Sequence, residues 1–156
     1  MDLLPSPWPY WIDATERSAC QTNDVPSGTS SSGPLASDIA AGTLPVTGEI
    51  TPNLCNDAHD CSLSTADTWL ADWVPALMAG PDYTSGRLTI LITFDEDDSS
   101  QGNTVAFVAI DPRLSGVTVS GRFDHYSLTR WLDDNAGVAP LRNAATAGDL
   151  RSAFGL

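Results

Sequence analysis

Basic residues are scarce in this sequence, and their scarcity limits the partners that the protein can bind. Only 7 lysine and arginine residues stand against 20 aspartate and glutamate residues, so the 156-residue chain has a formal net charge of −13. A surface this acidic repels phosphate backbones and anionic lipid headgroups. The composition therefore disfavours nucleic-acid binding and membrane-surface binding, and function has to reside in local clusters of residues.

Long apolar runs are also missing. No stretch approaches the roughly 20 apolar residues of a membrane-spanning helix. The opening segment MDLLPSPWPYWID has no basic n-region and no continuous apolar core, so we predict no transmembrane segment and no signal peptide in this chain. The hydrophobic content of 42% is still sufficient for one globular domain with a real core.

Cysteine is limited to three residues. Cys55 and Cys61 enclose a short polar loop, and a disulfide between them would suit an exported protein. Cys20 is then the odd thiol, either free or intermolecular. A zinc site is the alternative for the pair, although the sequence has no second cysteine pair to complete it.

The order of predicted elements indicates an α/β fold. Residues 14–34 are rich in Ser, Thr, Gly and Pro and predict a long loop or arm. Helical patterns alternate with two nearly continuous apolar runs, RLTILITF and NTVAFVAI, which are typical of strands covered on both faces. We therefore predict a mostly parallel sheet flanked by helices. The remaining predicted elements are a helix over 35–41 ended by Gly42, a strand in VTGEITPN, and helices in STADTWLADWVPALMAG, YSLTRWLDDNAG and TAGDLRSAFG, the last capped by Thr146 with Asp149 and closed by Gly155.

Tryptophans recur at helical spacing in the first long helix. Trp69, Trp73 and Leu77 are four residues apart and share one face. We interpret this stripe as a core face, with a ligand platform as the alternative. Pro75 lies within the same segment.

Three loops of the predicted sheet carry acidic or histidine side chains. They are TPNLCNDAHDC, FDEDD directly after a buried strand, and RFDHYSLTR directly before a helix, and they contain both histidines of the chain, His59 and His125. In a parallel sheet, such loops meet over a crevice at the carboxyl ends of the strands. Carboxylates and imidazoles grouped in this way repel or stay unsatisfied unless a divalent cation neutralises them. Taken singly, each has a local explanation: Asp124 caps a helix, Asp97 and Asp98 form a solvated turn, and Asn53, Asn56 and Asp57 make local turns.

The segments DVPSGTSSSGPLASDIAAGTLPVTGEITPNLCNDAHDCSLSTADTWLADWVPALMAG, LITFDEDD and RFDHYSLTRWLDDNAG resemble the phosphoesterase family that includes bacterial acid phosphatases and phospholipases C, within the alkaline phosphatase superfamily. The resemblance covers nearly the whole chain. It implies a metal-dependent phosphoric ester hydrolase with a divalent metal cation as cofactor and a phosphate ester as substrate. It also implies the C-terminal part of an alkaline-phosphatase-like fold.

The resemblance implies roles for six residues. Asp95 and Glu96 look like the paired metal ligands that follow a central strand. Asn53 and Asp57 are expected to bind the substrate or its phosphate. His59 and His125 are expected to be catalytic, His59 beside the leaving group and His125 as the late histidine that completes metal or phosphate binding.

One part of the family pattern is not found. The family carries a Ser or Thr nucleophile and a Glu-Asn metal-binding pair in an N-terminal half, whereas the opening segment of this chain resembles the middle of a family member. We therefore expect the chain to be the C-terminal portion of a phosphoesterase, inactive or nearly so alone. The full-length family member is expected to be extracytoplasmic or secreted. Thr51, Ser62 and Ser64 lie near the first loop, but hydroxyls at such positions are usually turn or cap residues.

Two non-catalytic functions compete with this interpretation. The first is a metal- or phosphate-binding module derived from such an enzyme. The second is an extracytoplasmic interaction protein whose acidic loops bind Ca²⁺ for structure, although DEDDSS lacks the glycine and the distant glutamate of an EF-hand loop.

Overall fold

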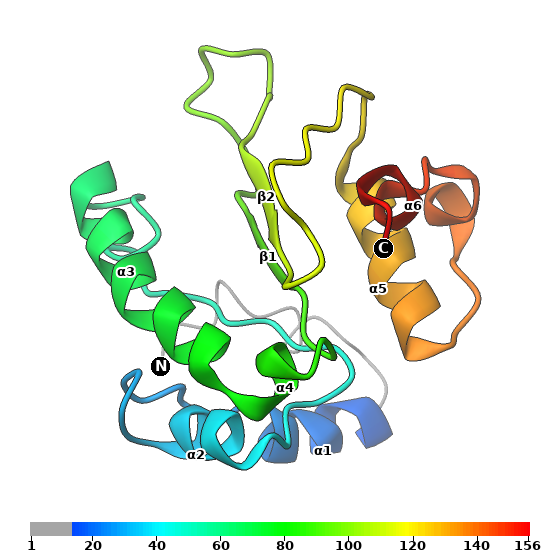
Figure 1. The fold of residues 1–156 in the computed structure, drawn as a ribbon. Coiled ribbons are helices and arrows are strands. Elements are labelled where there is room, and N and C mark those ends of the chain that lie inside the picture. The colour runs from blue at the N-terminus through cyan, green and yellow to red at the C-terminus, as the bar shows by residue number, and fades with distance from the viewer. Residues whose placement is uncertain (1–13) are drawn as a thin grey trace. The chain divides into compact units, whose positions relative to one another are not determined.

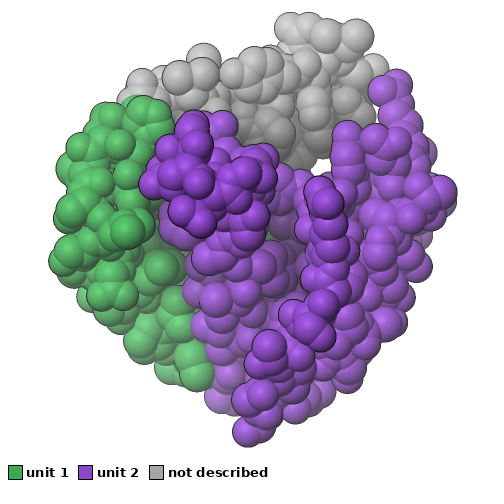
Figure 2. All heavy atoms as spheres, turned by 90° about the horizontal axis from the view of Figure 1, so that it is seen from above, with its two compact units in different colours: residues 1–43, 48–81 green, residues 44–47, 82–156 purple. Residues whose placement is uncertain are grey.

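The computed structural model describes residues 14–156 (Figure 1), which divide into two compact units (Figure 2). Unit 1 consists of the chain up to Thr43 together with Gly48–Pro81, and unit 2 consists of Leu44–Thr47 together with Asp82–Leu156. The opening segment of residues 1–13, in which the sequence predicts no signal peptide, lies outside the described residues. Among the helices of residues 14–156, none has both the length and the apolarity needed to cross a membrane.

Unit 1 is helical in its described part, with α1 at Ala14–Asn23, α2 at Pro34–Ala41 and α3 at Leu63–Ala79. The first of these forms within the segment predicted as a long loop, because residues 14–23 contain neither proline nor glycine. The second confirms the predicted helix over 35–41. It ends at Gly42, which adopts the left-handed conformation with φ 67°.

The core of unit 1 forms between α2 and α3. Ile39 of α2 and Ala66, Trp73 and Leu77 of α3 are buried. The core-face prediction is thus confirmed for Trp73 and Leu77. Trp69 is only half-buried, with its ring centroid 6.0 Å from that of Trp73. Ser62 occupies the N-cap position without a side-chain cap bond, and the helix begins at Leu63, before the predicted Ser64 start.

Unit 2 contains a two-stranded sheet of β1 (Ile90–Thr93) and β2 (Phe107–Ile110). Both strands were predicted, but they pair antiparallel, with Ile90 opposite Ile110 and Thr93 opposite Phe107. The predicted mostly parallel sheet is therefore not present in the described residues. The physical reason is the connection: a parallel pair needs a long crossover, usually helical, whereas residues 94–106 contain no helix and fold into a polar turn.

The strand predicted in VTGEITPN is also not formed in the described structure. Its apolar residues are too sparse to be covered, because Gly48 and Pro52 interrupt the run and Val46 is 70% exposed. The Val46 carbonyl instead accepts a hydrogen bond from the Asn135 side chain at 2.7 Å. Val46 and Thr47, the first two residues of the predicted strand, therefore belong to a loop of unit 2.

Four helical elements accompany the sheet: α4 (Pro81–Thr84), which begins at the unit boundary, α5 (His125–Ala136), η2 (Arg142–Thr146) and α6 (Leu150–Phe154). The last two pack against α5, where Trp131 is buried (Figure 1). The Phe154 ring lies 6.1 Å from both Trp131 and Phe107, so it joins the helices to the sheet. Asp149, rather than the predicted Thr146, caps α6, because Thr146 ends η2, and Gly155 closes α6 as predicted.

A buried carboxylate ties the two strands together outside their ladder. The Asp111 side chain, just after β2, is 0% exposed and accepts hydrogen bonds from Thr89 Oγ1 at 2.6 Å and from Arg113 Nε and Nη2 at 2.8 and 2.7 Å. The Arg113 guanidinium, and after it the Thr89 hydroxyl, hold the pKa of Asp111 well below its usual range. The start of β1 is thereby attached to the end of β2.

A second carboxylate attaches the separate segment 44–47 to the rest of unit 2. Asp82 is buried and accepts hydrogen bonds from Leu44 N at 3.1 Å and from the Arg87 side chain. The bond from Arg87 is the main cause of a lowered Asp82 pKa.

Candidate functional site

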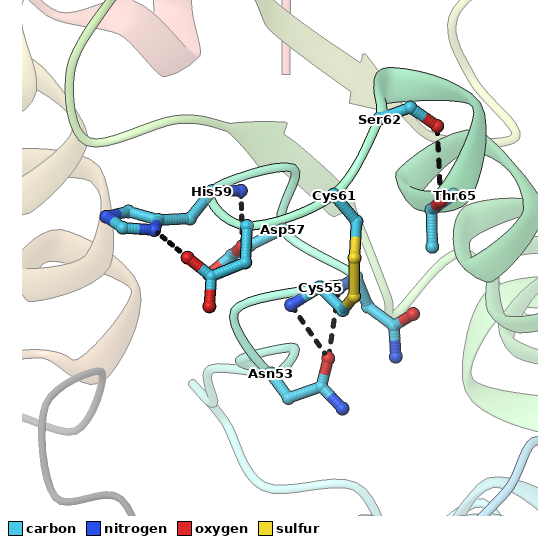
Figure 3. Close-up of a disulfide and its surroundings, with 9 residues drawn as sticks. Asn53, Cys55, Asp57, His59, Cys61, Ser62 and Thr65 are labelled. Atoms are coloured by element: carbon cyan, nitrogen blue, oxygen red, sulfur yellow. Dashed lines mark hydrogen bonds and ion pairs between the residues drawn. A yellow bond between two sulfur atoms is a disulfide. The ribbon is translucent and has the colours of Figure 1, made fainter.

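The first predicted site segment is a loop closed by a disulfide. Cys55 and Cys61 are bonded, with their Cα atoms 4.7 Å apart, which confirms the predicted pair (Figure 3). Cys20 is left out of this pair, as predicted. The bond fixes the ends of a seven-residue loop that contains Asp57 and His59 directly before α3.

Asn53 and Asp57 order this loop through their side chains. Asn53 Oδ1 accepts hydrogen bonds from the backbone N–H groups of Cys55 and Asn56, and Asp57 Oδ1 accepts one from His59 N at 2.8 Å. These are the local turn contacts that the sequence offered as an alternative. They occupy one oxygen of each side chain, so the predicted phosphate-binding roles would use the remaining atoms.

His59 is exposed and paired with a neighbouring carboxylate that sequence reasoning missed. Its Nδ1 lies 2.8 Å from Asp60 Oδ1 (Figure 3). Because a carboxylate only accepts, Nδ1 carries a proton in this contact, which fixes the orientation of the ring. The adjacency of histidine and aspartate in NDAHD was the signal available in the sequence.

Near this loop, the hydroxyl groups of Thr51 and Ser62 make local contacts. Thr51 Oγ1 donates to Glu49 Oε1 at 2.9 Å, and Ser62 Oγ lies 3.2 Å from Thr65 Oγ1 at the start of α3. Ser64 contributes its carbonyl to a bond from Thr68 Oγ1 at 2.8 Å. Among the described contacts none of these hydroxyls is bonded to a histidine, and the local contacts of Thr51 and Ser62 agree with the turn or helix-start positions expected for them.

The other two site segments meet within unit 2. His125 is the first residue of α5, and its Nε2 donates to the backbone carbonyl of Asp95 at 2.8 Å. Two predicted segments that are 30 residues apart in the sequence are thereby in contact. The bond holds the imidazole by Nε2 and leaves Nδ1 as the nitrogen that could take a metal or a phosphate oxygen.

Asp124 positions His125 by capping α5. Its Oδ1 accepts from Ser127 N at 3.1 Å, and Ser127 Oγ in turn accepts from Asp124 N, so the two residues form a capping box. The predicted cap is confirmed. Ser127 is buried, which fixes this first turn of the helix.

The acidic residues 95–98 that follow β1 divide into two pairs, one that builds a turn and one whose side chains are exposed. Asp97 accepts backbone hydrogen bonds from Gln101 N, Ser99 N and Asn103 N, and the bond from Gln101 is the largest cause of its lowered pKa. Asp98 likewise accepts from Ser100 N at 3.1 Å. These two carboxylates build the turn, as expected. The side chains of Asp95 and Glu96 are exposed, and Asp95 Oδ1 accepts only from Glu96 N at 3.0 Å among the described contacts.

The described residues alone do not form a metal centre. Nowhere in residues 14–156 are three histidine, cysteine, aspartate or glutamate side chains grouped so that they could hold a metal ion. Asn53, Asp57 and His59 belong to unit 1, whereas Asp95, Glu96 and His125 belong to unit 2. The convergence of all six in one crevice stays a prediction.

The sequence matches the Phosphoesterase family over residues 6–139, and the chain belongs to that family. The matched range contains the three site segments described above and extends over both units. Family membership thus confirms the resemblance that the three motifs indicated.

Three relatives illustrate the family. The chain is 36% identical over 109 residues to a phosphate-repressible acid phosphatase of Penicillium chrysogenum, a match that covers 67% of this chain and 26% of the relative. It is 34% identical over 109 residues to an acid phosphatase of Aspergillus fumigatus, covering 67% of this chain and 24% of the relative. It is 29% identical over 112 residues to a phosphatidylinositol-3-phosphatase of Mycobacterium tuberculosis, covering 72% of this chain and 37% of the relative. The matched stretch therefore spans only 24% to 37% of the length of these relatives, and no solved structure matches the chain.

Proposed function

We propose that this chain supplies part of the active site of a metal-dependent phosphoric ester hydrolase of the acid phosphatase type. The observation that carries the proposal is the family match over residues 6–139, which includes the site segments around His59, Asp95 and His125. The contact between His125 Nε2 and the Asp95 carbonyl supports it, because it joins two of these segments in unit 2.

In this proposal His59 is the general acid that protonates the departing alcohol. Asp60 accepts from Nδ1–H, so Nε2 is the ring nitrogen that faces the leaving group; in the imidazolium form its proton would pass to the leaving-group oxygen and leave a neutral ring. The disulfide between Cys55 and Cys61 limits the motion of the loop that carries this pair. A fixed donor lowers the entropic cost of aligning the acid with the ester.

Asp95 and Glu96 are proposed as partial ligands of a divalent cation, and His125 as a further ligand or phosphate contact through Nδ1. A divalent cation bound there would polarise a phosphoryl oxygen and activate a hydroxyl nucleophile. Exposed carboxylates suit this role, because their oxygens are accessible at the end of β1. Residues 14–156 as described group no three ligands, so we propose that Asp95, Glu96 and His125 supply only part of the metal site and that other residues complete it and provide the nucleophile.

The same proposal places the protein outside the cytoplasm. The Cys55–Cys61 disulfide supports this location, because such bonds persist in oxidising compartments.

Two measurements on the purified chain test the proposal: melting temperature against added Mg²⁺, Ca²⁺ or Zn²⁺, and hydrolysis of p-nitrophenyl phosphate. We expect a metal-dependent rise in melting temperature that Asp95→Ala removes, because a ligand that binds only the folded state stabilises it. The matched control Asp98→Ala, in the same acidic run, should retain the rise. Turnover by the chain alone should be very low. Robust metal-dependent turnover lost in Asp95→Ala would refute the incomplete site, and a melting temperature that responds to no metal would refute the proposed ligands.

A further inference from the structure

An open pocket of about 410 Å³ lies in unit 1, between the disulfide-closed loop and the first turns of α3. We propose that this pocket binds a sugar or a similar polyol. Its volume is within the range of ligand sites for small molecules, roughly 300–1,000 Å³. Its lining residues are Asn56, Ser64, Thr65, Thr68, Trp69 and Asp72.

The helical period explains why polar residues and one aromatic ring share this pocket. Thr65, Thr68 and Asp72 are spaced three and four residues apart, so they form one stripe along α3. The buried residues Ala66, Trp73 and Leu77 form a second stripe beside it. Trp69 falls between the two stripes, which is why one part of its ring packs towards Trp73 and another part lines the pocket.

The loop closed by the disulfide supplies one further lining residue, Asn56. Asn56 belongs to the loop that Cys55 and Cys61 close, and Cys61 directly precedes the Ser62 cap of α3. Asn56 is thereby held near the start of the helix. In Figure 3 His59 points away from α3, with the disulfide between it and Thr65. The pocket is therefore a different site from the one proposed for His59, and this inference is independent of hydrolase activity.

The polar groups of the pocket fit vicinal hydroxyls. Thr68 Oγ1 already donates to Ser64 O, so it presents only acceptor capacity. Among the described residues, the Asn56 carboxamide, the Ser64 hydroxyl and the Asp72 carboxylate make no side-chain hydrogen bond to protein. These groups provide both hydrogen-bond donors and acceptors within one pocket. Neighbouring hydroxyls of a sugar need both, because each hydroxyl donates and accepts.

The Trp69 indole also suits a sugar, and the negative charge of the protein limits which ligands can bind. A pyranose ring presents a face of C–H groups that can lie on the half-exposed Trp69 ring, with its hydroxyls directed at the polar stripe. An anionic ligand is disfavoured by Asp72 and by the net charge of −13. An apolar ligand would leave the polar lining desolvated and unpaired.

Calorimetric titration of the oxidised full chain with glucose, mannose, N-acetylglucosamine and myo-inositol tests the proposal, with choline chloride and inorganic phosphate as comparison probes. We expect saturable binding of at least one sugar or polyol in the millimolar range and none of the comparison probes. Asp72→Asn should weaken binding about tenfold, because it removes a charged acceptor. The matched control Asp67→Asn, exposed on the same helix but outside the pocket, should bind unchanged.

Trp69→Leu should abolish detectable binding, and Asn56→Leu should weaken it about tenfold, with circular dichroism to verify that each variant is folded. Reduction of the disulfide should also weaken binding, since it releases Asn56. The absence of saturable binding by every sugar and polyol would overturn the proposal. Preferential binding of choline would also overturn it. So would folded Asp72→Asn and Asn56→Leu variants that bind with the same affinity as the parent chain.

Discussion

Replacing the buried Asp111 by alanine should lower the free energy of unfolding by about 2–3 kcal/mol. The side chain is fully buried and accepts bonds from Thr89 and from the Arg113 guanidinium and backbone N–H. A hydrogen bond to a charged group contributes about 1.5–3 kcal/mol. Arg113 is 51% exposed, so water can solvate it again in the variant and its ion pair adds little. The main cost is the loss of the bridge between Thr89, before β1, and the end of β2.

The pH dependence of this effect has a definite sign. Arg113, and after it Thr89, lower the pKa of Asp111 in the folded protein, whereas in the unfolded chain it is about 3.9. The unfolded state therefore binds the proton first as the pH falls. The contribution of Asp111 to stability should be complete above about pH 5 and should decline below about pH 4.

Urea unfolding of the parent chain, Asp111→Ala and Asp111→Asn between pH 3 and pH 8 measures both effects. Asn should cost less than Ala, because its amide oxygen can still accept from Thr89. Asp133→Ala is the control. Asp133 lies in the last turn of α5, where a negative charge is unfavourable to the helix dipole, so its removal should not destabilise the protein. A difference below about 0.5 kcal/mol for Asp111→Ala at pH 7, or a difference that widens as the pH falls, would refute the reasoning.

Three further predictions concern the segments that carry the candidate site. Asp124→Ala removes the cap of α5 and should lower the free energy of unfolding by about 1 kcal/mol in urea titrations. Asp124→Ser should retain most of the stability, because serine can also cap a helix. Equal stability of the two variants would contradict the capping role. Thiol titration of the oxidised, denatured chain should find one thiol, from Cys20, and three would contradict the disulfide. Replacing Cys55 and Cys61 by serine should cost about 2 kcal/mol by chain entropy, and no loss in thermal unfolding would contradict the role of the closed loop.

Local sequence signals predicted the elements whose formation depends on nearby residues. The strands at β1 and β2 follow from continuous apolar runs, α5 from its Asp124 cap, and the ends of α2 and α6 from glycines at positive φ. The disulfide could be predicted because the six-residue separation of Cys55 and Cys61 lets the chain turn back on itself.

The direction of strand pairing could not be predicted in this way. Buried apolar strands suggested a parallel sheet, but pairing depends on the path of residues 94–106, and Asp97 folds that connection into a compact turn through backbone bonds. Asp149 rather than Thr146 caps α6 because η2, which no apolar period revealed, occupies the preceding residues.

For the site, the sequence supplied candidate residues, whose roles stay predictions, but not the contacts that these residues make. Two contacts became known only from the folded structure: Asp60 with His59, and the Asp95 carbonyl with His125. Only the first has a signal in the sequence, because Asp60 directly follows His59. The polar stripe of Thr65, Thr68 and Asp72 was readable at helical spacing, but the prediction concentrated on the tryptophans that it borders.

A chimeric enzyme tests the central claim most directly. In it, the matched stretch of the Penicillium chrysogenum acid phosphatase, which is 109 residues long in the alignment, is replaced by the corresponding residues of this chain. The measurement is kcat/KM for p-nitrophenyl phosphate, with and without a chelator. We predict metal-dependent hydrolysis that falls at least about 100-fold in His59→Ala and in Asp95→Ala and is retained in Asp98→Ala. A chimera that unfolds cooperatively but does not hydrolyse the ester, or one that keeps its activity in Asp95→Ala, would contradict the claim that this chain supplies part of a phosphoesterase active site.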